Sequence, residues 1–347
     1  MSGGVLAIRL RALGDVVLTT PALRALRHGF PGQPLDVVTD PRYVPLIEGL
    51  PGIRRVWPAP RSAAGTLALA RRLRGERYAL AVDFFGNPRS AFLTATSGAR
   101  ETAGYDLRGR RAAYRRRVPR EVPPAAGRRE YAAAVHVRLA TAAGGRPDGL
   151  AAEVALGDGA RAAAIAALAD AGVARPADTV GLVAAGTWGT KTWPVSHVAA
   201  FARRLLAAGV PLVVIAGPGE EPVVRALGTL VPGLRALPPT GVAALVGVIA
   251  ALRAVVGTDS GPRHVAAALG VPTFAWFGPT HPDTWAPPGA IHDHWWTPLP
   301  CRGCDRTACP HWNCLPGLAP DAAARTVLAH LERHARPAPD LGPAARA

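Results

Sequence analysis

Residues 5–23 of the chain read VLAIRLRALGDVVLTTPAL, and this stretch decides the fold. Its first six residues form an apolar run broken only by Arg9, which is typical of a strand buried in a parallel sheet. Gly14 lets the backbone turn sharply where the strand ends. Thr20 followed by Pro21 predicts the start of a helix that continues to about residue 28. The stretch therefore predicts a strand, a turn and a helix, the unit that builds parallel α/β sheets.

The alternation of strands and helices continues in two blocks of the chain. Strands are expected at residues 35–38, 78–82, 179–183, 212–215, 254–256 and 273–276, with helices between them and an Arg- and Pro-rich loop region at 100–130. Gly144, Gly145 and Pro147 mark a linker between the blocks. The pattern predicts an α/β protein of two Rossmann-like domains, residues 1–150 and 151–336, facing a central cleft. Residues 337–347 are expected to form a disordered tail.

The composition is globular, with an unusual excess of arginine. The 347 residues carry a formal net charge of +16 and include 39 Arg but a single Lys, Lys191. Such a charge predicts attraction to polyanions: nucleic acid, an anionic membrane face or a phosphorylated substrate. No apolar run reaches 18 residues, so no transmembrane helix is expected. The N-terminus shows no basic segment followed by an apolar one, so we expect no signal peptide and a cytoplasmic protein.

Three loops follow expected strands, at the sheet edge where such folds bind ligands. The first loop ends in Asp15, which reads either as a helix-capping carboxylate or as a general base. The second contains Thr187 and Lys191; Lys191 is either an ordinary surface lysine or the cation that neutralises a diphosphate leaving group. Neither loop has the glycine spacing of a dinucleotide-binding motif or of a P-loop.

The third loop, residues 257–264, leads into a helix whose first amides belong to Ser260 and Gly261. Free amides at a helix N-terminus bind anions, so this loop predicts a phosphate site. Asp259 beside it reads either as a helix cap or as an acceptor of hydrogen bonds from sugar hydroxyls. His264 is expected to contact phosphate or to pack inside the domain.

All four cysteines fall in one short segment, at Cys301, Cys304, Cys309 and Cys314, with His311 among them. The first pair has a spacing suited to zinc, whereas the other spacings are not typical. Three interpretations stay open: a structural zinc site, disulfides, which would be unusual in a cytosolic chain, and free structural thiols.

Two long motifs resemble a known family. Residues 6–23, which include Gly14 and Asp15, and residues 258–280, which begin Thr-Asp-Ser-Gly-Pro-Arg-His, are similar to the two signatures of glycosyltransferase family 9, the heptosyltransferases of lipopolysaccharide core assembly. The similarity extends through residues 191–194 and covers most of the chain. One departure lies at residues 83–87, where the resemblance implies a glutamine at the position of Phe84 or Phe85.

The resemblance implies a GT-B fold and an inverting, metal-independent transfer of a sugar, commonly heptose from ADP-heptose. Asp15 would deprotonate the acceptor hydroxyl, while Lys191 and residues 259–261 would hold the donor. From their places in the same loops, we expect Thr187 and His264 to bind the donor as well. It also implies that the last helix, at about residues 321–333, crosses back to the first domain. No cofactor is then needed for catalysis, and any zinc at the cysteines would be structural.

The densest positive charge lies at residues 108–120, where seven arginines occur. It reads either as a solvated loop rich in arginine by composition or as a cradle for an anionic acceptor. In the second interpretation Arg115, Arg116 and Arg117, together with Arg11, contact the acceptor. That acceptor would be an anionic glycan or glycolipid, reached at the inner face of the cytoplasmic membrane.

Two other functions stay open on the residues alone. A non-catalytic sugar-nucleotide-binding protein would share the donor loops but would not need Asp15. A nucleic-acid-binding protein would explain the charge, yet the arginine run has only Tyr114 interleaved and no nucleic-acid-binding motif is present. We therefore expect an enzyme of the hexosyl- and heptosyltransferase class with no nucleic-acid partner.

Overall fold

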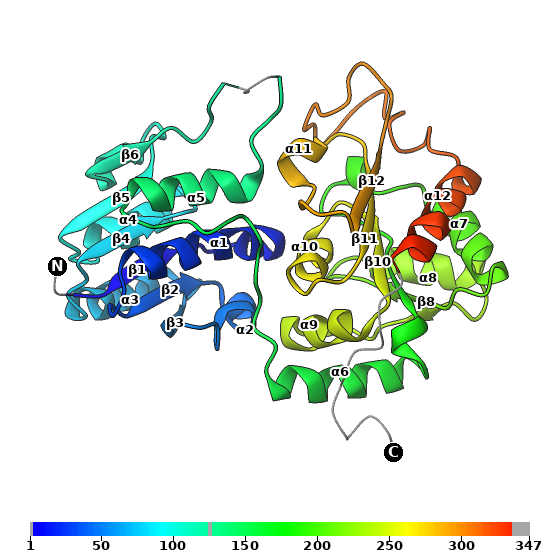
Figure 1. Cartoon of the computed structure of the whole chain (residues 1–347), viewed down its shortest axis with the longest axis horizontal. Coiled ribbons are helices and arrows are strands. Elements are labelled where there is room, and N and C mark those ends of the chain that lie inside the picture. The colour runs from blue at the N-terminus through cyan, green and yellow to red at the C-terminus, as the bar shows by residue number, and fades with distance from the viewer. Residues whose placement is uncertain (1–2, 124–126, 335–347) are drawn as a thin grey trace. The chain divides into compact units, whose positions relative to one another are not determined.

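The computed structural model describes residues 3–123 and 127–334, and its contacts divide the chain into two compact units, Met1–Ala155 and Leu156–Ala347 (Figure 1). The linker was expected near Gly144, Gly145 and Pro147 and the domain boundary at residue 150, a few residues before this division. The disordered tail expected at 337–347 lies outside the described residues.

The first unit is a parallel sheet of six strands in the order β3-β2-β1-β4-β5-β6. Helices α1 and α5 pack together on one face of the sheet, and α3 and α4 pack together on the other (Figure 1). The elements are β1 Val5–Ile8, α1 Leu13–Gly29, β2 Leu35–Thr39, α2 Val44–Ile47, β3 Ile53–Pro58, α3 Ala63–Gly75, β4 Leu80–Asp83, α4 Pro88–Thr96, β5 Glu101–Tyr105, β6 Arg116–Val118 and α5 Ala132–Ala142.

The second unit repeats this plan with the strand order β12-β11-β10-β7-β8-β9, again all parallel. Helices α7, α8 and α12 pack on one face, and α6, α9 and α10 on the other (Figure 1). The elements are α6 Asp158–Asp170, β7 Val180–Val183, α7 Val195–Ala207, β8 Leu212–Ile215, α8 Glu221–Leu230, β9 Arg235–Ala236, α9 Val242–Ala251, β10 Ala254–Thr258, α10 Gly261–Ala268, β11 Thr273–Phe277, α11 Pro282–Trp285, β12 His292–Trp296 and α12 Pro320–Arg333.

Both sheets have the strand order of a Rossmann fold, which confirms the prediction of two Rossmann-like halves. In each sheet the order reverses once, between β1 and β4 in the first unit and between β7 and β10 in the second. Ligands of open α/β sheets bind outside the carboxyl ends of the strands at such a reversal. We therefore expect a functional site at the loops that follow β1, β4, β7 and β10.

The first helix differs from the sequence-based expectation. α1 begins at Leu13 rather than after Thr20, so Pro21 lies inside it. A proline within a helix has no amide to donate to the carbonyl four residues earlier, here that of Val17. The Thr20 hydroxyl donates to the Val17 carbonyl at 2.8 Å and replaces the missing bond. Pro21 is therefore tolerated within α1.

Five strands were not expected. Residues 100–130, predicted to be a loop region, contribute β5 and β6, while β3, β9 and β12 lie in segments assigned to no element. Glu101–Tyr105 has few large apolar residues, and Arg116–Val118 begins with two exposed arginines. Apolar periodicity is the main sequence signal for a strand, and it is absent from both.

Helix α12 belongs to the core of the second unit, whereas the resemblance implied that it crosses to the first. Ala323, Ala324, Val327 and Leu331 are buried within that core, and α12 packs against α7. These four positions follow the spacing of one helix face, which explains why this face is buried.

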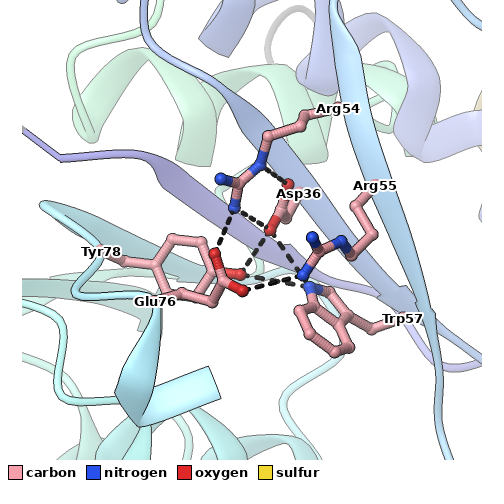
Figure 2. Close-up of polar contacts among 6 residues, drawn as sticks. All are labelled: Asp36, Arg54, Arg55, Trp57, Glu76 and Tyr78. Atoms are coloured by element: carbon pink, nitrogen blue, oxygen red, sulfur yellow. Dashed lines mark hydrogen bonds and ion pairs between the residues drawn. The ribbon is translucent and has the colours of Figure 1, made fainter. Parts of the chain in front are cut away.

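A polar cluster around the buried carboxylate of Asp36 joins β2, β3 and the segment that precedes β4 (Figure 2). The Asp36 carboxylate on β2 accepts hydrogen bonds from Arg54 Nε at 2.8 Å, Tyr78 Oη at 2.6 Å and Trp57 Nε1 at 3.1 Å. Glu76 accepts from the same Arg54 at 2.8 Å. Burial alone would raise the pKa of Asp36, but the hydrogen bonds from Arg54, Tyr78 and Trp57 outweigh it and hold the pKa below its usual value.

Because a lowered pKa stabilises the fold only while the group is ionised, we expect Asp36 to support the first unit at neutral pH and to lose this effect in acid. Asp36→Asn should lower the free energy of unfolding by about 2 kcal/mol at pH 7. The difference from the wild type should shrink as the pH falls below the ordinary carboxyl value of about 3.8.

Urea-induced unfolding followed by circular dichroism at neutral and acid pH measures both effects. Glu76→Gln is the matched control, because Glu76 lies in the same cluster but is partly exposed, and should cost about 0.5 kcal/mol. Equal losses in the two variants would show that the buried carboxylate has no special weight.

Candidate functional site

Asp15 lies in the first turn of α1, beside the reversal between β1 and β4. Its Oδ1 forms an ion pair with Arg9 at 2.6 Å, and its Oδ2 accepts a hydrogen bond from the Ala12 amide at 3.2 Å. The side chain of Arg9 is 3% exposed and that of Asp15 is 30% exposed. The carboxylate is therefore fixed from the protein side and open to solvent on the other. Asp15 can cap the helix and still accept a proton on its exposed side, because a carboxylate has about four lone pairs.

Arg9 was seen in the sequence only as an interruption of an apolar strand. The structure makes it a buried support: it donates to the Phe84 carbonyl at 2.7 Å, and its guanidinium lies 5.1 Å from the centre of the Phe85 ring. A charged residue inside a buried strand needs a partner, and this was the signal available in the sequence.

The loop after β4 is held by a buried carboxylate. Asp83 accepts hydrogen bonds from the amides of Phe85 and Gly86 at 2.8 and 2.9 Å and from the Tyr114 hydroxyl at 2.6 Å. Burial raises the pKa of Asp83 above its usual value. Of the two positions at which the resemblance implied a glutamine, Phe84 is fully buried and Phe85 lies under Arg9.

A pocket of about 360 Å³ opens at the carboxyl ends of β1 to β4, and we call it the arginine pocket. Its lining is dominated by positive charge, with one carboxylate: Leu10, Arg11, Asp40, Arg42, Ala59, Arg61, Phe85, Asn87 and Arg89. Asp40 accepts from Arg42 at 2.8 and 2.9 Å, so this one guanidinium is paired with a carboxylate in place. The excess of positive charge makes the pocket suited to an anion.

Of the arginines expected at the acceptor, Arg11 lines this pocket. Arg115, Arg116 and Arg117 do not line it and lie on or beside β6, at the edge of the sheet. Arg116 donates to the Ala142 carbonyl, and Arg117 donates to the Tyr114 carbonyl at 3.3 Å.

Sequence reasoning missed Arg42, Arg61 and Arg89 as site candidates. Arg42 and Arg61 follow β2 and β3, and β3 itself had not been expected. The available signal was their position after a strand, which could be read only once β3 was known.

In the second unit, Lys191 and Asp259 meet at the reversal between β7 and β10. Lys191 Nζ lies 3.1 Å from Asp259 Oδ2, which also accepts from the Thr280 hydroxyl at 3.0 Å. Arg263 lies 3.4 Å from the other oxygen. Burial alone would raise the pKa of Asp259, but the charges of Lys191, Arg263 and His264 outweigh it and hold the pKa below its usual value.

The other residues expected at the donor site differ in their burial and in their contacts. Ser260 immediately precedes α10, and its hydroxyl is buried with no hydrogen-bond partner among the described residues. Gly261 is the first residue of α10, so its amide is one of those left without a helical acceptor. His264 is buried and its ring packs 6.3 Å from that of Trp285, while Thr187 is exposed in the loop after β7.

The four cysteines line one pocket of about 320 Å³, together with His311, Trp312 and Thr190. Cys301 and Cys304 are exposed, Cys309 and Cys314 are partly buried, and all four are free thiols. Burial raises the pKa of the Cys314 thiol, and the neighbouring Cys304 and Cys301 raise it further.

Two features are absent from residues 3–123 and 127–334. No three His, Cys, Asp or Glu side chains in this part of the chain are arranged as a ready metal site. No helix within the same residues is both long and apolar enough to cross a membrane.

Comparison with solved structures identifies the fold. E. coli ADP-heptose LPS heptosyltransferase II superposes with a TM-score of 0.79 at 19% identity, over 95% of this chain and 99% of that chain. E. coli heptosyltransferase WaaC with ADP-2-deoxy-2-fluoro heptose superposes with a TM-score of 0.69 at 21% identity, over 94% of this chain and 99% of that one. The fold is therefore GT-B, the fold that the resemblance implied.

Comparison of sequences identifies the family to which the chain belongs. It matches the model of glycosyltransferase family 9 (heptosyltransferase) over residues 66–314. It is 29% identical over 329 residues to lipopolysaccharide heptosyltransferase 1 of Pseudomonas aeruginosa, covering 88% of this chain and 87% of that relative. The chain belongs to glycosyltransferase family 9 (heptosyltransferase) and is a glycosyltransferase.

The geometry predicts strong coupling between Lys191 and Asp259. Lys191→Met should lower the free energy of unfolding by about 3 kcal/mol, because it removes one partner of a buried ion pair. Adding Asp259→Asn to Lys191→Met should restore part of this loss, since the buried carboxylate that lost its Lys191 partner is then gone. Urea denaturation of the wild type, both single variants and the double variant gives the coupling energy. Additive losses would mean that the two side chains do not act as a pair.

Proposed function

We propose that the chain transfers a heptose from ADP-heptose to a hydroxyl of a lipopolysaccharide-core-like acceptor, with inversion at the anomeric carbon. The observation that carries the proposal is the Asp15 carboxylate, fixed by buried Arg9 at the strand reversal of the first unit and still open to solvent. Family membership supports the glycosyl-transfer chemistry. The relative from E. coli with ADP-2-deoxy-2-fluoro heptose supports the choice of donor.

In the proposed reaction Asp15 accepts the proton of the acceptor hydroxyl, and the oxygen attacks the anomeric carbon of the sugar. The bond between that carbon and the diphosphate oxygen breaks, and ADP leaves with the electron pair. Lys191 neutralises the charge that develops on the leaving diphosphate, and the Ser260 and Gly261 amides bind its oxygens. Attack opposite to the leaving group inverts the anomeric configuration.

We assign the acceptor to the first unit and the donor to the second. Asp259 is proposed to hold Lys191 and to accept from sugar hydroxyls through its remaining lone pairs. Thr187 and His264 are assigned to the outer part of the donor site. No metal ion takes part in the proposed transfer, because Lys191 and the amides of α10 supply the positive charge that the leaving group needs.

The arginine pocket is proposed to bind an anionic group of the acceptor, a phosphate or a carboxylate. Guanidinium groups bind both groups through paired hydrogen bonds, and the pocket lies beside the strand reversal that carries Asp15. Arg115, Arg116 and Arg117 are proposed as a second, outer contact with the same anionic acceptor. The enzyme would then work in the cytoplasm, at the inner face of the membrane that presents the glycolipid.

The direct test is transfer to a purified lipopolysaccharide-core acceptor, with ADP-heptose compared with UDP-, GDP- and dTDP-sugars. We expect a heptosylated product with inverted anomeric configuration, seen by mass spectrometry and NMR, at a rate unaffected by added Mg²⁺ or Mn²⁺. Faster transfer from another nucleotide sugar would reject the donor assignment. Retention of configuration would reject the role of Asp15 as base.

Asp15→Asn should reduce kcat by roughly 10² to 10⁴ because the amide cannot accept the proton. ADP affinity, measured by calorimetry, should be nearly unchanged, which also checks that the second unit is folded. Circular dichroism of the variant checks the first unit. If the variant keeps more than about a tenth of the wild-type rate, a general-base role of this size is excluded.

Arg11→Ser with Arg61→Ser should raise the acceptor KM by about tenfold or more and leave the donor KM unchanged, because each charged hydrogen bond contributes about 1.5–3 kcal/mol. Arg115→Ser with Arg116→Ser and Arg117→Ser is the comparison variant and should have a smaller effect that disappears at high salt. A larger effect of the β6 triple than of the pocket pair would move the main anion site to β6.

A further inference from the structure

The cysteine pocket lies in an irregular part of the second unit. Residues 297–319, which we call the cysteine segment, contain neither helix nor strand, and they connect β12 to α12. Leu315 and Leu318 anchor the end of the segment in the core, whereas Cys301 and Cys304 are exposed. Long loops without secondary structure are uncommon in compact domains unless they serve a function. A segment with so little core of its own needs a further cross-link to hold one conformation.

The four thiols of the segment can form such a cross-link. Every cysteine of the chain lies in this segment, and all four line one pocket. Gly278 permits the close packing of the segment on the loop after β11, because a Cβ there would lie 2.8 Å from Cys314 Sγ. Arg306 lines the same pocket and offers positive charge beside the sulfurs.

The cysteine segment also holds the loop that carries Lys191. The Thr190 hydroxyl donates to the Arg306 carbonyl at 2.7 Å, and Trp312 Nε1 donates to the Thr190 carbonyl at 3.1 Å. Thr190 is buried and directly precedes Lys191, which pairs with Asp259 at 3.1 Å. The conformation of the segment is therefore transmitted by two hydrogen bonds to the lysine proposed to stabilise the leaving group.

We propose that Cys301, Cys304, Cys309 and Cys314 bind one thiophilic divalent cation, zinc or ferrous iron, and that this ion fixes the cysteine segment against Thr190. In the described part of the chain no three His, Cys, Asp or Glu side chains already form a metal site, so binding requires the four thiols that line this pocket to move together. The ion draws the thiols together as each loses its proton, so that four thiolates surround the cation and four protons are released. Arg306 offsets part of the net negative charge of this tetrathiolate site.

The metal site itself does not depend on the proposed function, whereas its effect on the donor loop does. The full-length wild type, purified with reductant and without chelator or histidine tag, should contain about one zinc or iron per chain by mass spectrometry of metals. Apo protein should bind Co²⁺ with the absorption bands of tetrahedral thiolate coordination. Cys301→Ser with Cys304→Ser should abolish both signals, and His311→Ala, in the same pocket, should retain both.

The wild type overturns the proposal if it contains no zinc or iron and its reduced apo form takes up none of the three ions. Loss of metal in His311→Ala would overturn the four-thiolate ligand set. Disulfides, detected as missing thiols without metal, would also overturn it. These outcomes are read from metal content and spectra, so they stand even if the chain proves not to use ADP-heptose.

The link to the donor loop has its own test. Trp312→Phe keeps the ring but removes the donor to Thr190, so it should keep the metal and weaken ADP binding by about fivefold, the equivalent of one ordinary hydrogen bond. Removing the metal from the wild type should weaken ADP binding at least as much. Unchanged ADP affinity in both cases would reject the link and leave the metal site standing, whereas wild-type protein that binds no ADP would count against the proposed function instead.

Discussion

The structure depends on one constraint of parallel sheets: all strands end on the same edge, and the strand order reverses only once in each sheet. At the reversal the neighbouring connections leave toward opposite faces, so the loops on either side separate and polar side chains can gather there. β10 approaches β7 so closely at this point that a Cβ on Gly257 would lie 2.1 Å from the Val183 carbonyl oxygen. This contact brings Lys191, which follows β7, to Asp259, which follows β10.

Each reversal then carries a buried charge whose partner comes from the same edge. Arg9 is almost fully buried and is compensated by Asp15 and by the Phe84 carbonyl, while Asp259 is compensated by Lys191 and Arg263. An unpaired charge at either position would be costly to bury, so the pairs fix the side chains before any substrate binds. Under the proposed function the same arrangement serves catalysis, because groups held in place need little reorganisation when charge develops in the transition state.

The sequence predicted the loops that follow the central strands, but it missed the strands at the edges of the sheets. The reason is physical. Central strands such as Leu212–Ile215 are buried on both faces and read as continuous apolar runs. Ile53–Pro58 contains Arg54 and so reads as polar, yet this arginine faces Asp36 across the sheet, a partner that no local pattern shows. The arginine pocket was missed for the same reason, because Ala59 and Arg61 in its lining follow that strand. Which charges gather in space is a property of the topology, and the sequence gives it only after the strand order is known.

Whether a position holds arginine or lysine also depends on the partners that the side chain meets in space. A guanidinium can bind a carboxylate as a planar fork, as Arg54 does on Asp36 and Arg42 does on Asp40. Lys191 instead presents a compact ammonium, 3.1 Å from one oxygen of Asp259 and 5.3 Å from the centre of the Trp188 ring. A fork would occupy both carboxylate oxygens, whereas a point charge engages one of them here and still has donors to offer a second anion. Under the proposed function, a chain that uses arginine at every other Lys or Arg position keeps lysine where one cation serves two anionic partners, Asp259 and the leaving diphosphate.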